Sequence, residues 1–182
     1  MERRESPIVR LVHTTLLTLP PRDSGGAVHV VIESPAGSRV KLKYARDLGG
    51  FVLSRPLLLG VSYPFDWGFV PGTQASDGDP VDAMVLLDVP TYPGVIVLCR
   101  PLALLQVEQD AKGGGQRERN DRILVEPPVA RRPTGRLSKR LKQELEEFFI
   151  SVTLLEGKNL KVLGWEGAAA AEELIDHSRR SR

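Results

Sequence analysis

The chain has 182 residues, of which 41% are hydrophobic and 26% are charged, as expected for one globular domain with a sizeable core. Its 25 basic and 23 acidic side chains leave a formal net charge of +2, which argues against bulk electrostatic binding of nucleic acid. The single cysteine, Cys99, excludes an intrachain disulfide, and its apolar neighbours favour a packing residue over a nucleophile.

Other features of the sequence bear on its location. No apolar run is long enough to span a bilayer, so no membrane partner is expected. The first five residues, Met-Glu-Arg-Arg-Glu, lack the apolar core of a secretory signal. A lone cysteine also suits a reducing compartment. These features together predict a cytoplasmic protein.

The first part of the chain predicts an extension followed by strands. We expect residues 1–26 to form an N-terminal extension with one or two short strands, and residues 27–182 to form a single domain. Apolar residues in alternation or in short runs predict strands over residues 28–33, 40–44, 51–55, 83–87, 95–107 and 123–125. Residues 63–69 are aromatic and turn-rich. Residues 108–121, with three consecutive glycines and alternating charges, predict a flexible loop.

Helical spacing dominates the last part of the chain. Apolar residues from Leu137 to Val152 recur every three or four positions, and Gly157 is a suitable stop signal. Residues 160–163 predict a short strand, and residues 168–178 an amphipathic helix. Many short strands followed by late helices predict a mainly β fold, in which a closed or half-closed barrel carries two C-terminal helices on its outside.

The most informative stretch is Asp77-Gly78-Asp79-Pro80-Val81-Asp82, which places three carboxylates within six residues, just before an apolar run of strand length. Mutually repelling carboxylates at the mouth of a strand need a positive partner. Hard oxygen ligands of this kind suit Mg²⁺, with Mn²⁺ as the alternative. A plain solvated turn is the competing interpretation, because turn chemistry explains every residue of the stretch except Asp82.

The spacing Asp-x-Asp-Pro-x-Asp resembles the signature of the soluble inorganic pyrophosphatases, and every position of that signature is matched. Further segments match the same family in the same order: Val31-Ile32-Glu33, Gly37-Ser38-Arg39-x-Lys41, Tyr63-Pro64, Cys99-Arg100-Pro101 and Gly164-Trp165-Glu166. The resemblance implies a five-stranded barrel of the OB type with flanking helices. It also implies hydrolysis of pyrophosphate to two phosphates with magnesium, by a homo-oligomer that is usually a hexamer in bacteria.

The resemblance also implies roles for individual residues. The family's metal site corresponds to Asp77, Asp79, Asp82 and Glu33, and Asp79 also corresponds to the residue that helps to activate the attacking water. The substrate-binding positions correspond to Lys41, Arg55 and Tyr63. The alternative for the two cations is an ordinary surface ion pair, which contributes little to stability.

Several family positions are occupied by other residue types. The family has glutamate where this chain has Lys43, and a phosphate-contacting tyrosine where it has Trp67. Metal-binding aspartates of the family correspond to Gln109 and Asn120. A phosphate-contacting Tyr-Lys pair corresponds to Val152-Thr153. Asp110 and Asp121 each lie one residue beyond a lost aspartate, so they are candidates for replacement ligands. Each change from carboxylate to amide beside a divalent ion removes attraction on the order of several kcal/mol. About 1.4 kcal/mol corresponds to tenfold in rate when the loss falls on the transition state.

Three functions follow as hypotheses. The first is a magnesium-dependent inorganic diphosphatase whose activity is much reduced by these replacements. The second is a non-catalytic paralogue that retains metal or phosphate binding and serves as a partner or regulatory subunit. The third, an OB-type nucleic-acid binder, would need exposed aromatic residues on a basic face, and an aromatic content of 5% argues against it.

Overall fold

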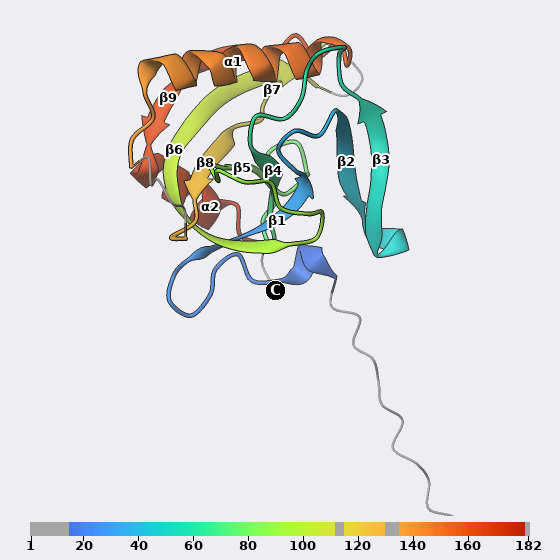
Figure 1. Cartoon of the computed structure of the whole chain (residues 1–182). Coiled ribbons are helices and arrows are strands. Elements are labelled where there is room, and N and C mark those ends of the chain that lie inside the picture. The colour runs from blue at the N-terminus through green and yellow to red at the C-terminus, as the bar shows by residue number, and fades with distance from the viewer. Residues whose placement is uncertain (1–14, 112–114, 130–134, 181–182) are drawn as a thin grey trace, which may run out of the picture.

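Five strands close into a ring in the computed structural model, which describes residues 15–111, 115–129 and 135–180 (Figure 1). In ring order they are β1 (Val28–Ser34), β4 (Asp66–Val70), β5 (Val81–Val85), β8 (Arg122–Glu126) and β6 (Ile96–Asp110), and β6 pairs back to β1. Only the β5–β8 pairing within this ring is parallel. The predicted fold class, mainly β with five ring strands and two late helices, is confirmed.

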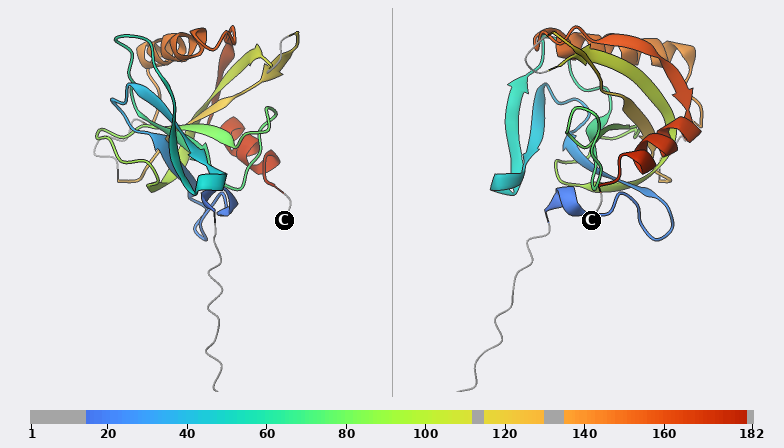
Figure 2. Two further views of the ribbon diagram at one scale, coloured as in Figure 1. Left: turned by 90° about the vertical axis from the view of Figure 1, so that its right-hand side faces the viewer. Right: turned by 180° about the vertical axis from the view of Figure 1, so that it is seen from behind.

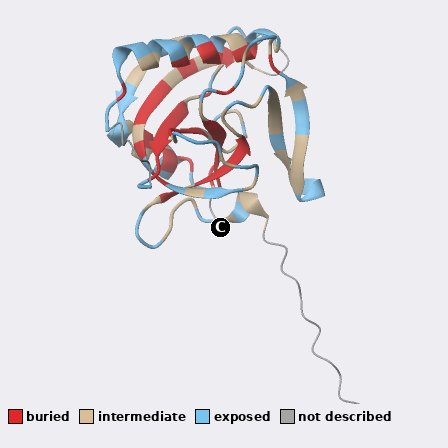
Figure 3. Cartoon of the chain, viewed as in Figure 1, coloured by how far each residue is buried: buried red, intermediate tan, exposed pale blue. Residues whose placement is uncertain are grey.

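The side chains of the ring alternate between two apolar clusters, as the pleat of a strand requires. Leu124 packs in the cluster beneath α1 (Lys139–Leu154), together with Leu145 and Phe149 of that helix. Its neighbours Ile123 and Val125 pack in the other cluster, to which α2 (Ala168–His177) contributes two buried residues. Strands β1, β4, β5 and β8 are buried along almost their whole length, whereas β6 begins with several exposed residues; Figure 3 shows this difference in red and pale blue.

The remaining elements extend or flank the ring. Strands β2 (Val40–Ala45) and β3 (Gly50–Pro56) form a separate hairpin that stands beside the ring, as Figure 1 and the right view of Figure 2 show. Strands β7 (Arg117–Arg119) and β9 (Lys161–Gly167) pair with β6. Two short 3₁₀ turns, Leu16–Thr18 and Arg46–Leu48, complete the described elements.

Two stretches differ from the sequence prediction. Part of the aromatic stretch at residues 63–69 forms the start of β4, which is buried and pairs with both β1 and β5. The described part of residues 108–121 is mostly a hairpin of β6 and β7 rather than a flexible loop. Its alternating charges form cross-strand ion pairs, in which Arg117 contacts Glu108 and Asp110. Opposite charges on facing strands stabilise the pairing.

The N-terminal segment also differs in its described part. Residues 16–18 form a 3₁₀ turn where short strands were predicted, and residues 1–14 lie outside the described ranges. The turn is held to the domain by the N–H of Gly72, which donates to Leu17 O at 2.9 Å. The division of the chain at residue 26 stays a prediction. No helix in the described ranges has the length and apolar character needed to cross a membrane.

Close approach of β4 to β1 predicts a strict requirement for glycine at one position. A Cβ atom at Gly68 would meet Val31 O at 1.9 Å, and both strands lie inside the ring, so neither can move aside. We expect Gly68→Ala to lower the free energy of unfolding by more than about 3 kcal/mol. Urea unfolding followed by circular dichroism measures this loss. Gly167→Ala, where a Cβ meets nothing within 4 Å, is the control and should cost no more than about 1 kcal/mol. Equal losses in the two variants would contradict the prediction.

Candidate functional site

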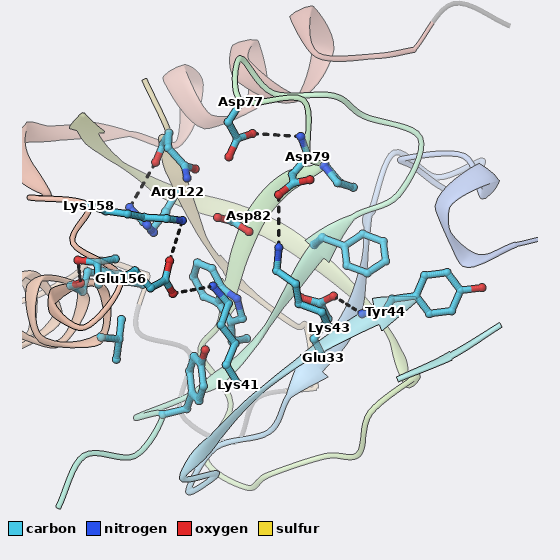
Figure 4. A pocket seen from close by; sticks show the side chains of 18 of the residues that line it. Glu33, Lys41, Lys43, Tyr44, Asp77, Asp79, Asp82, Arg122, Glu156 and Lys158 are labelled. Atoms are coloured by element: carbon cyan, nitrogen blue, oxygen red, sulfur yellow. Dashed lines mark hydrogen bonds and ion pairs between the residues drawn. The ribbon is translucent and has the colours of Figure 1, made fainter. Parts of the chain in front are cut away.

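A pocket of about 170 Å³ lies where the ring, the β2–β3 hairpin and the C-terminal part of α1 meet (Figure 4). Five acidic side chains line it: Glu33, Asp77, Asp79, Asp82 and Glu156. Five basic side chains line it as well: Lys41, Lys43, Arg55, Arg122 and Lys158. The formal charges of the described lining residues therefore cancel. All seven residues to which the sequence assigned metal or substrate binding, Tyr63 included, lie in this one pocket.

The acidic stretch forms a tight turn that leads into β5. Gly78 adopts a φ of +85°, in the left-handed region that favours glycine, and its N–H donates to Ala75 O at 3.0 Å. The N–H of Asp79 donates to Asp77 Oδ1 at 3.1 Å, which holds the Asp77 carboxylate against the turn. Asp82 is the second residue of β5, opposite Arg122 on β8, and burial raises its pKa. The turn and the strand together direct three carboxylates to one side of the pocket.

Glu33 approaches from β1 and is 9% exposed. Its Oε1 accepts a hydrogen bond from the backbone N–H of Tyr44 at 2.7 Å, which joins β1 to the first strand of the hairpin. Burial raises the pKa of Glu33 to about 7, although the hydrogen bond from Tyr44 acts in the opposite direction. A carboxyl group in this environment needs a nearby positive charge to stay ionised.

Lys43 supplies positive charge beside these carboxylates. Its Nζ lies 3.4 Å from Asp79 Oδ2. Burial alone would lower the pKa of Lys43, but the carboxylates of Asp79, Asp82 and Glu33 outweigh burial and raise it. The ammonium group is therefore held in its charged form. Figure 4 shows it lying between Asp79 and Glu33.

Glu156 compensates the basic side of the pocket. Its Oε1 accepts from Arg55 Nε at 2.7 Å and lies 3.6 Å from Lys41 Nζ, while Oε2 lies 2.8 Å from Lys158 Nζ. Burial would raise its pKa, but Lys41, Lys158 and Arg55 together lower it to about 2. Sequence reasoning missed Glu156 and Lys158 because they follow α1 without any local pattern that would mark them.

Arg122 was also missed as a site residue, although it lies beside the Asn120 position to which the resemblance drew attention. Its side chain is 4% exposed, and its guanidinium carbon lies 4.8 Å from the ring centroid of Phe149. Arg122 Nη1 donates to Asn120 O at 3.3 Å, whereas Nε has no hydrogen-bond partner among the described residues. Burial lowers the pKa of Arg122, and the pull of Asp82 and Asp77 opposes this.

The replaced positions fall into two groups. Five of them line the pocket: Lys43, Trp67, Asn120, Val152 and Thr153. Trp67 packs against Phe149 with ring centroids 5.4 Å apart. Gln109 lies outside the lining and donates from Nε2 to Glu118 Oε1 at 3.2 Å.

The two candidate replacement ligands also lie outside the pocket lining. Asp110 is bound by Arg117 at 2.8 Å and by Asn159. Asp121 accepts from the N–H of Val107 at 2.9 Å and pairs with Arg119 at 2.7 Å. Asn120 lines the pocket and its neighbour Asp121 does not, as expected where successive side chains face opposite ways, whereas Gln109 and Asp110 both lie outside the lining.

Comparison with known proteins identifies the family. The family model for inorganic pyrophosphatase matches residues 30–182. The chain is 37% identical over 166 residues to an inorganic pyrophosphatase of Synechocystis, a match that covers 88% of this chain and 95% of the relative. The chain belongs to the inorganic pyrophosphatase family. An inorganic pyrophosphatase of Thermus thermophilus is 40% identical over 172 residues, covering 88% of this chain and 93% of the relative. The crystal structure of an inorganic pyrophosphatase from the same organism matches with a TM-score of 0.80 at 36% identity, over 90% of this chain and 96% of that chain.

The pocket of this pyrophosphatase-family chain has oxygen donors suited to a metal ion, but they do not form a closed cluster. Carboxylates of the kind that magnesium prefers come from the acidic turn and from Glu33. Within the described ranges, however, no three His, Cys, Asp or Glu side chains are close enough together to hold a metal ion. The donor chemistry fits magnesium, whereas the arrangement compensates the carboxylates with the Lys43 ammonium group.

The ion pairs of Glu156 predict an acid-sensitive contribution to stability. The pKa of Glu156 is about 2 in the folded protein, below the ordinary 4.5, so the unfolded chain binds this proton more tightly. The stability from Glu156 is therefore complete above about pH 4.5 and is lost as the pH falls towards 2. We expect Glu156→Gln to cost about 1–3 kcal/mol at pH 7 and clearly less at pH 3, as measured by urea unfolding. Glu173→Gln, at an exposed site on α2, is the control. A cost of Glu156→Gln that is equal at both pH values would contradict the prediction.

Proposed function

We propose that this pocket binds pyrophosphate and hydrolyses it to two phosphates with magnesium, at a rate much reduced by the replaced residues. The observation that supports this most strongly is the convergence of Asp77, Asp79, Asp82 and Glu33 with Lys41 and Arg55 in one pocket. Those residues come from four strands and one turn of a pyrophosphatase-family fold. A cavity of about 170 Å³ is also small beside the several hundred Å³ typical of pockets for larger organic ligands, which favours a small anion.

In this proposal the basic side of the pocket binds phosphate and the acidic side binds the metal ion. Lys41, Arg55 and Tyr63 bind the phosphate groups, and Arg122 and Lys158 add further positive charge on the same side. Magnesium, or manganese in its place, would be held by the four carboxylates, where it would neutralise the phosphates and make a bound water more acidic. Asp79, which lies next to Lys43, would take the proton of the attacking water.

The reduced rate follows from charge. A phosphoanhydride brings several negative charges, and its hydrolysis relies on cations that neutralise them in the transition state. Lys43 places a fixed positive charge where the resemblance implies a glutamate, so it weakens the attraction of the carboxylates for a metal ion. Asn120 lines the pocket as an amide with no net charge. Val152 and Thr153 cannot hold an anion by charge.

A non-catalytic paralogue that still binds phosphate or metal is the second candidate. The observation that favours it is the cancellation of formal charge in the pocket, with the Lys43–Asp79 pair on the acidic side and the Glu156 pairs on the basic side. A pocket that compensates its own charges has less need of metal ions. Such a protein would act as a partner or regulatory subunit.

The remaining parts of the proposal concern the setting of the protein. We infer a cytoplasmic homo-oligomer, with the hexamer that the family resemblance implies. The family relationship and the pocket support pyrophosphate as the ligand, and neither nucleic acid nor a membrane is proposed as a partner.

A phosphate-release assay with pyrophosphate and magnesium tests the enzyme directly. We expect slow hydrolysis by the unmodified protein and a rise of at least about tenfold in Lys43→Glu combined with Asn120→Asp, because both changes restore attraction for divalent ions. Calorimetric titration with magnesium should show tighter binding in the same variant and weaker binding in Asp82→Asn. Lys139→Glu, an exposed change on α1 with the same change of charge as Lys43→Glu alone, is the control for net charge.

Three outcomes of these measurements decide between the candidates. Brisk hydrolysis by the unmodified protein would show that the replacements do not limit the rate. Phosphate binding without hydrolysis in every variant would favour the non-catalytic paralogue. A response of Lys139→Glu as large as that of the double variant would show that net charge alone, rather than the pocket, controls the effect.

A further inference from the structure

We propose that Glu156 is an internal anion that occupies the phosphate-binding side of the pocket and must be displaced before a phosphate group reaches the cations. The inference rests on the proposed binding of phosphate in this pocket. It adds a residue that controls which anions can enter, by a contact within the chain itself.

The contacts of Glu156 are those expected of a bound anion. Its two carboxylate oxygens meet three cations from three different parts of the chain: Lys41 at 3.6 Å, Arg55 at 2.7 Å and Lys158 at 2.8 Å. Lys41 and Arg55 are the residues to which phosphate binding was assigned. One carboxylate therefore uses the donors that the proposed substrate needs, and Figure 4 shows it directed toward Lys41 and Lys158.

The Arg55 guanidinium would remain in place if Glu156 withdrew. Arg55 also donates to Val152 O at the C-terminal end of α1 and to Pro56 O, so its guanidinium is anchored independently of Glu156. Arg122 is held by Asn120 O and by the aromatic face of Phe149. Its Nε, buried and without a partner among the described residues, is a donor that an incoming anion could use.

The segment that carries Glu156 is able to move without opening the core. Glu156 follows the end of α1, where its N–H donates to Thr153 O, and the next residue, Gly157, has a φ of +64°. Leu154 and Leu155, which precede it, are 65% and 64% exposed and add nothing to the core. The carboxylate is thus held by its ion pairs rather than by packing of its turn.

The need to displace the Glu156 carboxylate makes the pocket selective for highly charged anions. A singly charged anion offers the cations no more than the Glu156 carboxylate does, and it also suffers repulsion from that carboxylate. Phosphate and pyrophosphate carry more charge and more acceptor oxygens, so they can compensate for the lost pairs. The Glu156 ion pairs therefore favour multiply charged phosphates and phosphoanhydrides as ligands.

The test compares anion binding by the unmodified protein and by Glu156→Gln in a buffer with chelator and no metal. Glutamine keeps the shape and one acceptor oxygen but removes the charge. Calorimetric titration with inorganic phosphate and with pyrophosphate should show affinity at least about tenfold higher in Glu156→Gln. Glu156→Asp, which keeps the charge, should show no such gain. Glu172→Gln is the matched control, because it removes a glutamate paired with Arg22, outside the pocket lining.

A second measurement uses the unmodified protein and so does not depend on the folding of any variant. Addition of pyrophosphate with magnesium should shift the amide resonances of Glu156 and Gly157 in a nitrogen-15 correlation spectrum, because the carboxylate leaves its partners. Unchanged or weaker anion binding by Glu156→Gln, or binding of pyrophosphate without movement of these two resonances, would overturn the inference and leave the proposed function standing. Failure of the unmodified protein and of Glu156→Gln to bind pyrophosphate, with or without magnesium, would overturn both.

Discussion

Charge compensation inside a partly buried pocket is the constraint on which the site depends. Five carboxylates gathered in a small volume repel one another, and burial adds to the cost of keeping each of them ionised. The chain meets this constraint with its own cations, since Lys43 lies 3.4 Å from Asp79 and three cations surround Glu156. The pocket can therefore form in the folded protein without ions taken from solution.

The ring of strands holds these charged side chains in place despite their repulsion. Glu33 and Asp82 lie on neighbouring parts of a buried sheet, where backbone hydrogen bonds and two apolar clusters fix their positions. The hairpin β2–β3 then brings Lys41, Lys43 and Arg55 over the same opening, and the N–H of Tyr44 joins it to Glu33. Apolar burial elsewhere in the chain offsets the cost of gathering ten charged side chains in one place.

The sequence predicted features that have a local signature and missed those that depend on tertiary contacts. Alternation identified most ring strands, and the apolar spacing from Leu137 to Val152 identified α1, because both patterns express one buried face. The acidic turn was recognisable from its spacing. By contrast, β7 forms because Arg117 meets acidic residues on the opposite strand, and a charged stretch with three glycines gives no sign of that partner. Glu156 and Lys158 reach the pocket only because α1 ends beside it.

A lysine and a metal ion compensate the charge of carboxylates in physically different ways, and the difference affects the chemistry that the pocket can perform. The Lys43 ammonium carries one charge and is covalently tethered. It can donate hydrogen bonds to a water or a phosphate oxygen, but it cannot bind that oxygen as a metal ion does. A divalent ion carries twice the charge and lowers the pKa of the water that it binds. Under the proposed function, a chain of the pyrophosphatase family with lysine in this place would retain a charge-balanced pocket and lose part of the power to polarise a phosphoanhydride. In the same proposal, phosphate binding depends on the four cations on the opposite side of the pocket, so affinity and turnover would change independently.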